Sequence, residues 1–283
     1  MVRLVSHIVD VLIEERAPHL VASGFWPVLR PALYALLGYT KARDMVDAVA
    51  HMSGRAALDY VAGLLAVQVQ VTGLEHLPKT GRLVLISNHP TGIADGVAVY
   101  DALKARRPDL CFFANSDAHR VCPGFDDVLI PVEWVEEKRT RERARLTLKR
   151  AQEAFEAERP VMIFPAGRLA RRGANGRLMD PDWMPSALSL AKKHNAPVLP
   201  IHMTGPNSTL FHLFDKVSRE LRDITLFHEL LNKRGGQFSL TLGPLIAPGQ
   251  LGADSGLATL ALKAYVETQL PDDPGRAFAQ VAA

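Results

Sequence analysis

Residues 88–96 read Asn-His-Pro-Thr-Gly-Ile-Ala-Asp-Gly and place an imidazole, His89, six positions before a carboxylate, Asp95. A histidine followed by proline and glycine does not fit a regular helix or strand, so we expect a turn that exposes the ring. If Asp95 folds back to accept a hydrogen bond from one ring nitrogen, it fixes the tautomer and leaves the other nitrogen as a general base. Such a base, without a nucleophile of its own, would activate a hydroxyl group of the substrate. The alternative is a loop histidine beside an aspartate that only caps a helix.

A second turn, Phe164-Pro165-Ala166-Gly167-Arg168, follows another apolar run. The stretch that begins there has no acidic residue before Asp180 and holds four arginines: Arg168, Arg171, Arg172 and Arg177. The guanidinium group presents a planar set of donors that matches phosphate oxygens, so one interpretation is a phosphate site. The other interpretation is a solvated basic loop.

Both turns follow short apolar segments, which alternate with helical segments along the chain. We expect strands at 83–87, 110–114, 128–132, 161–164, 198–203 and 238–242, a half-buried strand from residue 67, and helices at 96–105, 139–157, 183–194 and 210–221. Apolar strands separated by helices indicate an α/β fold, a mostly parallel sheet flanked by helices. Ligands of such sheets bind at the carboxyl ends of the strands, where both turns are expected.

Apolar residues at helical spacing before residue 67 predict an N-terminal helical subdomain over 1–66. The α/β domain then covers 67–270, and the proline- and glycine-rich segment 271–283 is expected to be a flexible tail. A chain of 283 residues with a formal charge of +3 gives no support for a nucleic-acid partner. Two cysteines without a ligand cluster indicate a reducing compartment and no metal site. No apolar run is long enough to span a bilayer, and the N-terminus is a poor secretory signal, which favours the cytoplasm.

The two turns and the later segment Val198-Leu199-Pro200-Ile201 together resemble the glycerolipid or lysophospholipid acyltransferase superfamily. Its signatures are a His followed by an Asp, then Phe-Pro-Glu-Gly with a nearby Arg, then an apolar stretch with Pro, and the similarity extends over about 69–246. The family separates its His and Asp by four residues, whereas five lie between His89 and Asp95, and Ala166 stands in place of the Glu. Both departures resemble the haemolysin-like branch, some members of which are similar to lyso-ornithine-lipid acyltransferases.

The resemblance implies an O-acyltransferase that moves a fatty acyl group from acyl-CoA or acyl carrier protein to the hydroxyl of a lysolipid. It implies His89 as base and Asp95 as its orienting partner, with no cofactor or metal beyond the acyl donor. The substrate would be bound by residues of the two turns: Asn88, Gly92, Phe164, Pro165, Gly167, Arg168 and Arg171. The segment around Asn115 and Arg120 corresponds to the second family block. Two alternatives remain, a lipid- or acyl-carrier-binding protein without turnover and a metal-dependent hydrolase built on His89, Asp95 and Asp117.

Three segments could meet a membrane or a carrier protein. Residues 136–160 carry a basic helix face, residues 210–221 form an amphipathic stretch, and Phe25, Trp26 and Leu29 lie near the N-terminus. Each is more often a solvated or core-facing helix. A lipid acceptor must nevertheless be reached from the cytoplasm, so we expect a cytoplasmic protein that associates peripherally with the inner face of the cell membrane.

Overall fold

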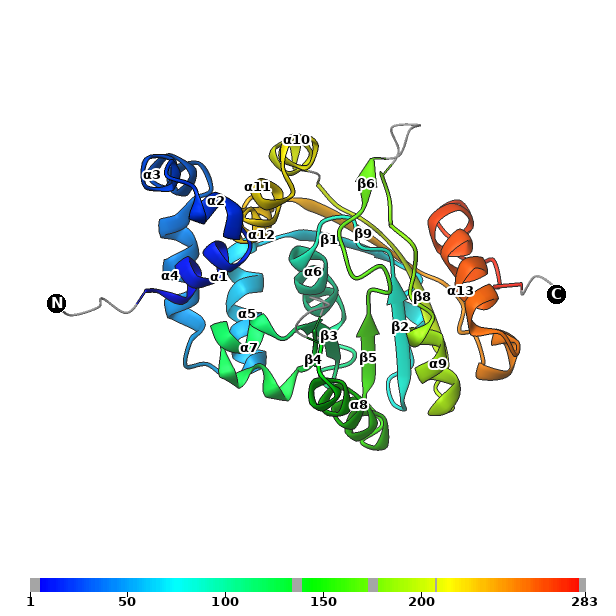
Figure 1. Cartoon of the computed structure of the whole chain (residues 1–283). Helices are drawn as coiled ribbons and strands as arrows, with labels where there is room; N and C mark the ends of the chain where they lie inside the picture. Colours follow the sequence, from blue (N-terminus) through cyan, green and yellow to red (C-terminus); the bar gives the residue numbers. More distant parts are fainter. Residues whose placement is uncertain (1–5, 134–138, 173–177, 207, 280–283) are drawn as a thin grey trace.

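A seven-stranded sheet forms the centre of the computed structural model, which describes residues 6–133, 139–172, 178–206 and 208–279 (Figure 1). The strand order is β1-β9-β8-β2-β5-β3-β4. The strands are β1 (Gln68–Thr72), β2 (Leu83–Ser87), β3 (Cys111–Asn115), β4 (Leu129–Val132), β5 (Pro160–Ile163), β8 (Val198–Thr204) and β9 (Gln237–Leu242). Every pairing is parallel except that of β8 with β9, so β1 and β9 run opposite to the other strands. The expected α/β fold with a mostly parallel sheet is confirmed.

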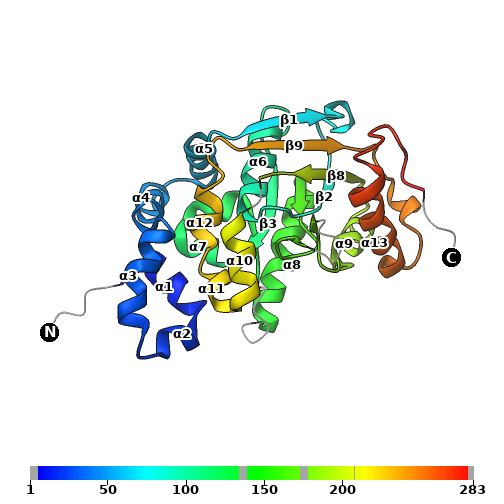
Figure 2. The same cartoon turned by 90° about the horizontal axis from the view of Figure 1, so that it is seen from above.

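Helices cover both faces of the sheet, which explains why its central strand is apolar at nearly every position (Figure 2). In β2, Leu83 and Leu85 pack with one core cluster and Val84 and Ile86 with the other, as the two-residue period of a strand requires. The first face is covered by α5 (Gly54–Leu65), α6 (Ile93–Leu103) and α12 (Leu226–Leu231). The second face is covered by α8 (Arg141–Glu156), α9 (Ser186–Lys193) and α13 (Ser255–Ala264).

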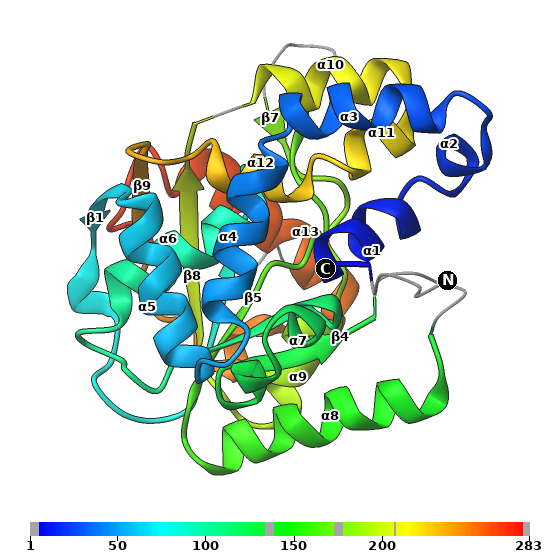
Figure 3. The ribbon, with the colours of Figure 1, turned by 90° about the vertical axis from the view of Figure 1, so that its left-hand side faces the viewer.

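The N-terminal helices are present as expected, but they share the core of the sheet. Besides α5 they are α1 (Ile8–Glu15), α2 (Pro18–Ala22), α3 (Trp26–Leu36) and α4 (Tyr39–Val49), which lie on one side of the molecule (Figure 3). Val9, Val46 and Leu85 belong to one continuous apolar cluster. These helices therefore pack onto the first face of the sheet and do not enclose a core of their own.

Three local expectations differ from the structure. The single helix expected at 210–221 is two helices, α10 (Thr209–Val217) and α11 (Arg219–Asp223), because Ser218 is extended and its hydroxyl accepts from Leu221 N at the start of α11. Helix α13 was not expected at all. In the described part of the tail expected to be flexible from residue 271, Phe278 is buried against the Tyr265 ring, and the Tyr265 hydroxyl donates to Arg276 O.

Short elements complete the described chain. They are α7 (Asp117–Val121), the hairpin of β6 (Arg171–Arg172) and β7 (Leu178–Met179), the 3-10 turns Leu74–His76, Pro123–Asp127 and Pro248–Leu251, and one π-helical turn, Tyr265–Gln269. Among the described residues no helix is both long and apolar enough to cross a membrane. The β6–β7 hairpin lies above the carboxyl ends of β2 and β5 in Figure 1, so it stands next to the turns that the sequence singled out.

Candidate active site

The turn after β2 is fixed to the neighbouring strand by Asn88. The Asn88 Oδ1 accepts from Met203 N at 2.7 Å, and its Nδ2 donates to Met203 O at 2.8 Å. Both ends of the buried amide are therefore occupied by the backbone of β8. Asn88, which the sequence placed among the substrate-binding residues, positions the turn through these two bonds.

The structure brings His89 and Asp95 together. His89 Nδ1 lies 3.0 Å from Asp95 Oδ2, the Asp95 side chain is fully buried, and 16% of the His89 side chain is exposed. The distance is that of a hydrogen bond, but the angle at Nδ1 lies outside the range of one. Catalytic hydrogen bonds are often poorly aligned without substrate and tighten in the complex. The pair thus has the placement that a base and its orienting carboxylate require.

Asp95 is held rigidly by the turn that it caps. It is the third residue of α6, and its carboxylate accepts from Thr91 N at 2.9 Å, from Gly92 N at 3.1 Å and from the Thr91 hydroxyl. Gly92 has a φ of +83°, and a Cβ there would lie 3.1 Å from the side chain of Leu169. Glycine is therefore needed at this position. Asp95 thus caps α6 and also faces His89 with the same carboxylate.

The Phe-Pro-Ala-Gly turn after β5 borders the imidazole. The rings of His89 and Phe164 stack with centroids 4.3 Å apart, and Ala170 N donates to His89 O at 3.0 Å. Pro165 is buried, whereas Gly167 turns the chain with a φ of +61°. Both predicted turns therefore meet at one point, at the carboxyl edge of the sheet.

The structure describes the side chains of two of the four arginines that follow the second turn. Arg168 and Arg171 are exposed, and neither forms an ion pair with the residues that the structure describes. Arg177 lies outside the described residues, as does the side chain of Arg172. The two exposed guanidinium groups are thus available to an anionic ligand near the second turn.

Asp180, which the sequence did not single out as a site residue, accepts hydrogen bonds from the backbone of His89. The His89 N–H points at both carboxylate oxygens of Asp180, at 3.0 and 3.1 Å, and Trp183 Nε1 donates to Oδ2 at 2.8 Å. Burial raises the pKa of Asp180 to about 6, although these hydrogen bonds act in the opposite direction. The only signal in the sequence was an acid that ends an arginine-rich run.

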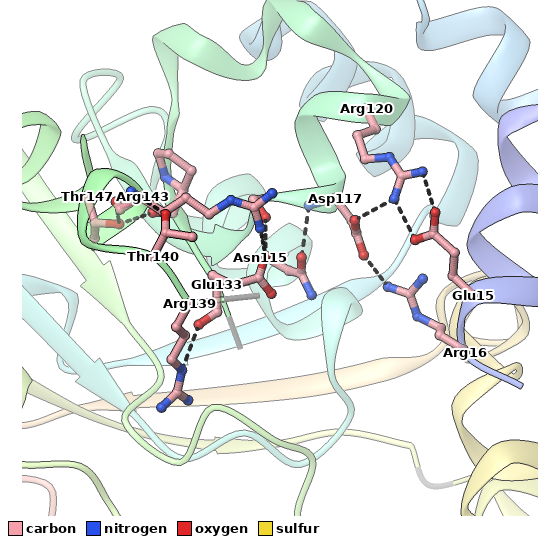
Figure 4. Close-up of polar contacts among 12 residues, drawn as sticks. Glu15, Arg16, Asn115, Asp117, Arg120, Glu133, Arg139, Thr140, Arg143 and Thr147 are labelled. Carbon is pink, nitrogen blue, oxygen red and sulfur yellow. Dashed lines mark hydrogen bonds and ion pairs between the residues drawn. The ribbon is translucent and has the colours of Figure 1, made fainter. Parts of the chain in front are cut away.

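The second family block forms a polar network that joins the sheet to the N-terminal helices (Figure 4). Asn115 Oδ1 accepts from Asp117 N at 2.8 Å. Arg120 binds both carboxylate oxygens of Glu15, at 2.8 and 2.9 Å, and Arg16 Nη2 donates to Asp117 at 2.7 Å. The side chains of the two polar candidates, Asn115 and Arg120, are thus bonded to neighbouring protein groups. The network ties α1 to the end of β3.

This geometry does not support the alternative of a metal-dependent hydrolase. Asp117, which it would need as a ligand beside His89 and Asp95, bonds to Arg16 and Arg120 instead. Among the residues described, no group of three or more His, Cys, Asp and Glu side chains could hold a metal ion.

A small pocket borders the turn at Pro90 and Thr91, with a volume of about 10 Å³. Its walls also include Ser208 and Phe211 from the start of α10, and Glu229 and Lys233. A cavity of this volume holds about one water molecule, so it has room for a single polar atom of a ligand and not for a fatty acyl chain.

Comparison with known proteins agrees with the motifs. Residues 68–204 match the acyltransferase family model. Lyso-glycine lipid O-acyltransferases of Phocaeicola vulgatus and Bacteroides thetaiotaomicron are each 28% identical, over 186 and 185 residues. These matches cover 63% of this chain and 64% and 66% of the two relatives, so the chain spans just under two thirds of their length. A solved 1-acyl-sn-glycerophosphate acyltransferase from Thermotoga maritima is 13% identical, with 95% of this chain and 96% of that chain covered and a TM-score of 0.48, which does not establish a common fold.

The fold and the site define an α/β protein with a His–Asp pair at the carboxyl end of a central parallel strand. The match over residues 68–204 agrees with the resemblance of the motifs to the glycerolipid acyltransferase superfamily.

Proposed function

We propose that this protein is an O-acyltransferase that moves a fatty acyl group from an acyl thioester to the hydroxyl group of a lysolipid. One observation carries the proposal: His89 Nδ1 lies 3.0 Å from the buried Asp95 carboxylate at the end of β2. With Nδ1 facing Asp95, Nε2 is the atom left to accept a proton. The match to the acyltransferase family model and the lyso-glycine lipid O-acyltransferases among the relatives support the same chemistry.

The reaction would run in two steps. His89 Nε2 takes the proton of the acceptor hydroxyl as its oxygen attacks the thioester carbonyl carbon, and Asp95 stabilises the imidazolium that forms. The tetrahedral oxyanion then collapses, the carbon–sulfur bond breaks, and the thiolate leaves and takes up the proton from His89. Backbone N–H groups of the two turns, at 88–92 and 164–167, are the proposed oxyanion donors. The products are an ester and a free thiol.

The acceptor proposed here is a lysolipid with an amino-acid headgroup. The family Glu that accompanies glycerol-phosphate recognition is replaced by the buried Ala166, and the two curated relatives are named for a glycine lipid. Lyso-glycine and lyso-ornithine lipids are therefore the first acceptors to test, with lysophosphatidic acid as the comparison.

Contact with the cytoplasmic face of the membrane belongs to the same proposal. Large exposed apolar side chains occur on α10 and at the start of α3: Phe25, Val28, Leu213 and Val217. Both helices lie at the side of the molecule toward which β2 and β5 point (Figures 1 and 3). Glu220 of α11 accepts from the backbone N–H groups of His19 and Leu20, which links α2 to α11. An apolar surface beside the strand ends would bring the acceptor to His89.

The donor is either acyl-CoA or acyl carrier protein, and the basic helix expected to meet a carrier gives little support for the latter. Residues 136–138 of that segment lie outside the described residues. In α8, Arg143 pairs with Glu133, and Lys149 and Arg150 each lie 3.7 Å from the Glu153 carboxylate. Charges paired in this way are typical of a solvated helix.

A transfer assay tests the proposal. Purified protein is incubated with labelled palmitoyl-CoA or palmitoyl carrier protein and each of the three lysolipids, and the labelled diacylated product is measured. We expect product with at least one donor and an amino-acid lysolipid. Tight binding of the acceptor or carrier without any transfer would instead support the second candidate, a lipid- or carrier-binding protein on the same fold, which the loss of the family Glu at Ala166 favours.

A further inference from the structure

A buried ion pair, Glu229 with Lys233, lines the pocket beside the catalytic turn. The two residues are 6% and 2% exposed, and Lys233 Nζ lies 3.1 Å from Glu229 Oε2. Lysine is almost never fully buried unless it is paired. The pair lies at the end of α12, and its four-residue spacing is that of an ordinary surface ion pair, so no sequence pattern indicates its burial.

The ammonium group of Lys233 is only partly satisfied. It has three N–H donors, and among the residues described here Glu229 Oε2 is its one hydrogen-bond acceptor. A buried donor without a partner is costly, so an acceptor atom brought by a ligand would be bound favourably. The unfilled donors therefore point to an anionic or carbonyl-bearing group in this pocket.

The position of the pocket connects it to the reaction. Its opposite wall contains Pro90 and Thr91, which directly follow His89. The Thr91 hydroxyl donates to Asp95, the partner of His89. An acceptor that places one headgroup oxygen in this space of about 10 Å³ would thus lie beside the turn that carries the base, while its lipid chains extend away from the pocket.

The charge of the pair selects the kind of anion. Glu229 already neutralises Lys233, and Glu229 also lines the pocket. A group with one negative charge can bind the unfilled donors of Lys233, whereas the second charge of a phosphate monoester would face the Glu229 carboxylate at close range. The site thus favours a carboxylate.

We propose that Lys233, held in place by Glu229, binds the carboxylate of the acceptor's amino-acid headgroup and selects it over a phosphate headgroup. This inference rests on the proposed acyltransferase function and names the substrate class of the same site. The Lys233 Nζ would donate a charge-assisted hydrogen bond to a carboxylate oxygen.

The test compares lyso-glycine lipid with its methyl ester, which keeps the reacting hydroxyl and removes the charge. The wild-type protein should have a kcat/KM for the acid that exceeds that for the ester by about tenfold or more, as expected for a charge-assisted hydrogen bond. The double variant Lys233→Met/Glu229→Gln removes both charges, so that no unpaired charge remains buried. It should lose the preference for the acid, so that its kcat/KM values for the acid and for the ester become about equal. Lys149→Met, the same change on the exposed face of α8, should leave both values unchanged.

Each outcome bears on a different statement. A wild-type protein that acylates the ester as well as the acid, or that prefers lysophosphatidic acid, overturns the headgroup inference and leaves the acyltransferase function standing. A double variant that still acylates the ester and keeps the preference for the acid also overturns the inference. A wild-type protein that acylates none of the acceptors with either donor contradicts the proposed function itself, and the inference falls with it. A wild-type acid-to-ester ratio near one overturns the inference even where the double variant does not fold.

Discussion

Replacing Asp180 by asparagine should change how the stability of the protein depends on pH. Asp180 is 6% exposed, and burial raises its pKa from 3.8 to about 6. The unfolded chain therefore releases this proton near pH 4, while the folded protein keeps it until about pH 6. Between these values the folded state binds more protons, so the stabilising contribution is complete below pH 4 and is lost as the pH rises through 6. The pKa difference corresponds to roughly 3 kcal/mol at 1.36 kcal/mol for each pH unit.

Chemical unfolding of the wild type and of Asp180→Asn at pH 4, 5, 6 and 7 measures this effect. Titrating groups that do not interact with Asp180 contribute equally to both proteins, so they cancel in the difference between the two free energies of unfolding. We expect the wild type to lose about 2.5 kcal/mol of the roughly 3 kcal/mol relative to the variant between pH 4 and pH 7, because the unfolded carboxyl is already partly ionised at pH 4, with little further change above pH 7. The same series with Asp182→Asn, an exposed aspartate two positions away, controls for the substitution itself. A difference between wild type and Asp180→Asn that stays constant over this range would refute the reasoning.

Three further predictions follow from packing and exposure. Gly124→Ala should destabilise the protein by about 1–3 kcal/mol in chemical unfolding, because its Cβ would lie 2.1 Å from Met52 O. Gly63→Ala, exposed in the last turn of α5 with nothing within 4 Å, should instead stabilise it by about 0.5–1 kcal/mol, and equal effects of the two changes would contradict the packing. The double change Leu213→Ser/Val217→Ser should weaken binding to anionic vesicles severalfold in a sedimentation assay, whereas Leu257→Ser on α13 should not, and unchanged binding of the α10 variant would exclude this membrane surface.

The parts of the site that lie close together in the chain could be predicted from the sequence. His89 and Asp95 fall within one turn, so their types, their spacing and the surrounding proline and glycine were enough to pair them. The strands were equally accessible because their apolar runs are buried on both faces of the sheet. The family resemblance then predicted that the two turns lie together, which no local sequence pattern indicates.

The parts that depend on contacts between distant segments could not be predicted. Asp180 reaches His89 across 91 residues of chain, and Asn88 reaches Met203 across 115. Asn88 was noticed for its place in the motif, but its amide partners are set by the pairing of β2 with β8. Glu229 and Lys233 have the spacing of a surface pair, and only the packing of α12 onto the sheet buries them. Burial and long-range pairing are properties of the tertiary structure, so no local sequence pattern predicts them.

The central claim is that the imidazole of His89, oriented by Asp95, is the base that starts acyl transfer. The most direct measurement is the rate of product formation by His89→Ala with the thioester donor and lysolipid acceptor that the wild type uses, after thermal unfolding has shown that the variant is folded. We predict a rate reduced by a factor of at least about 10² to 10⁴, the usual contribution of general acid–base catalysis. A folded His89→Ala protein that forms product at the wild-type rate would contradict the claim.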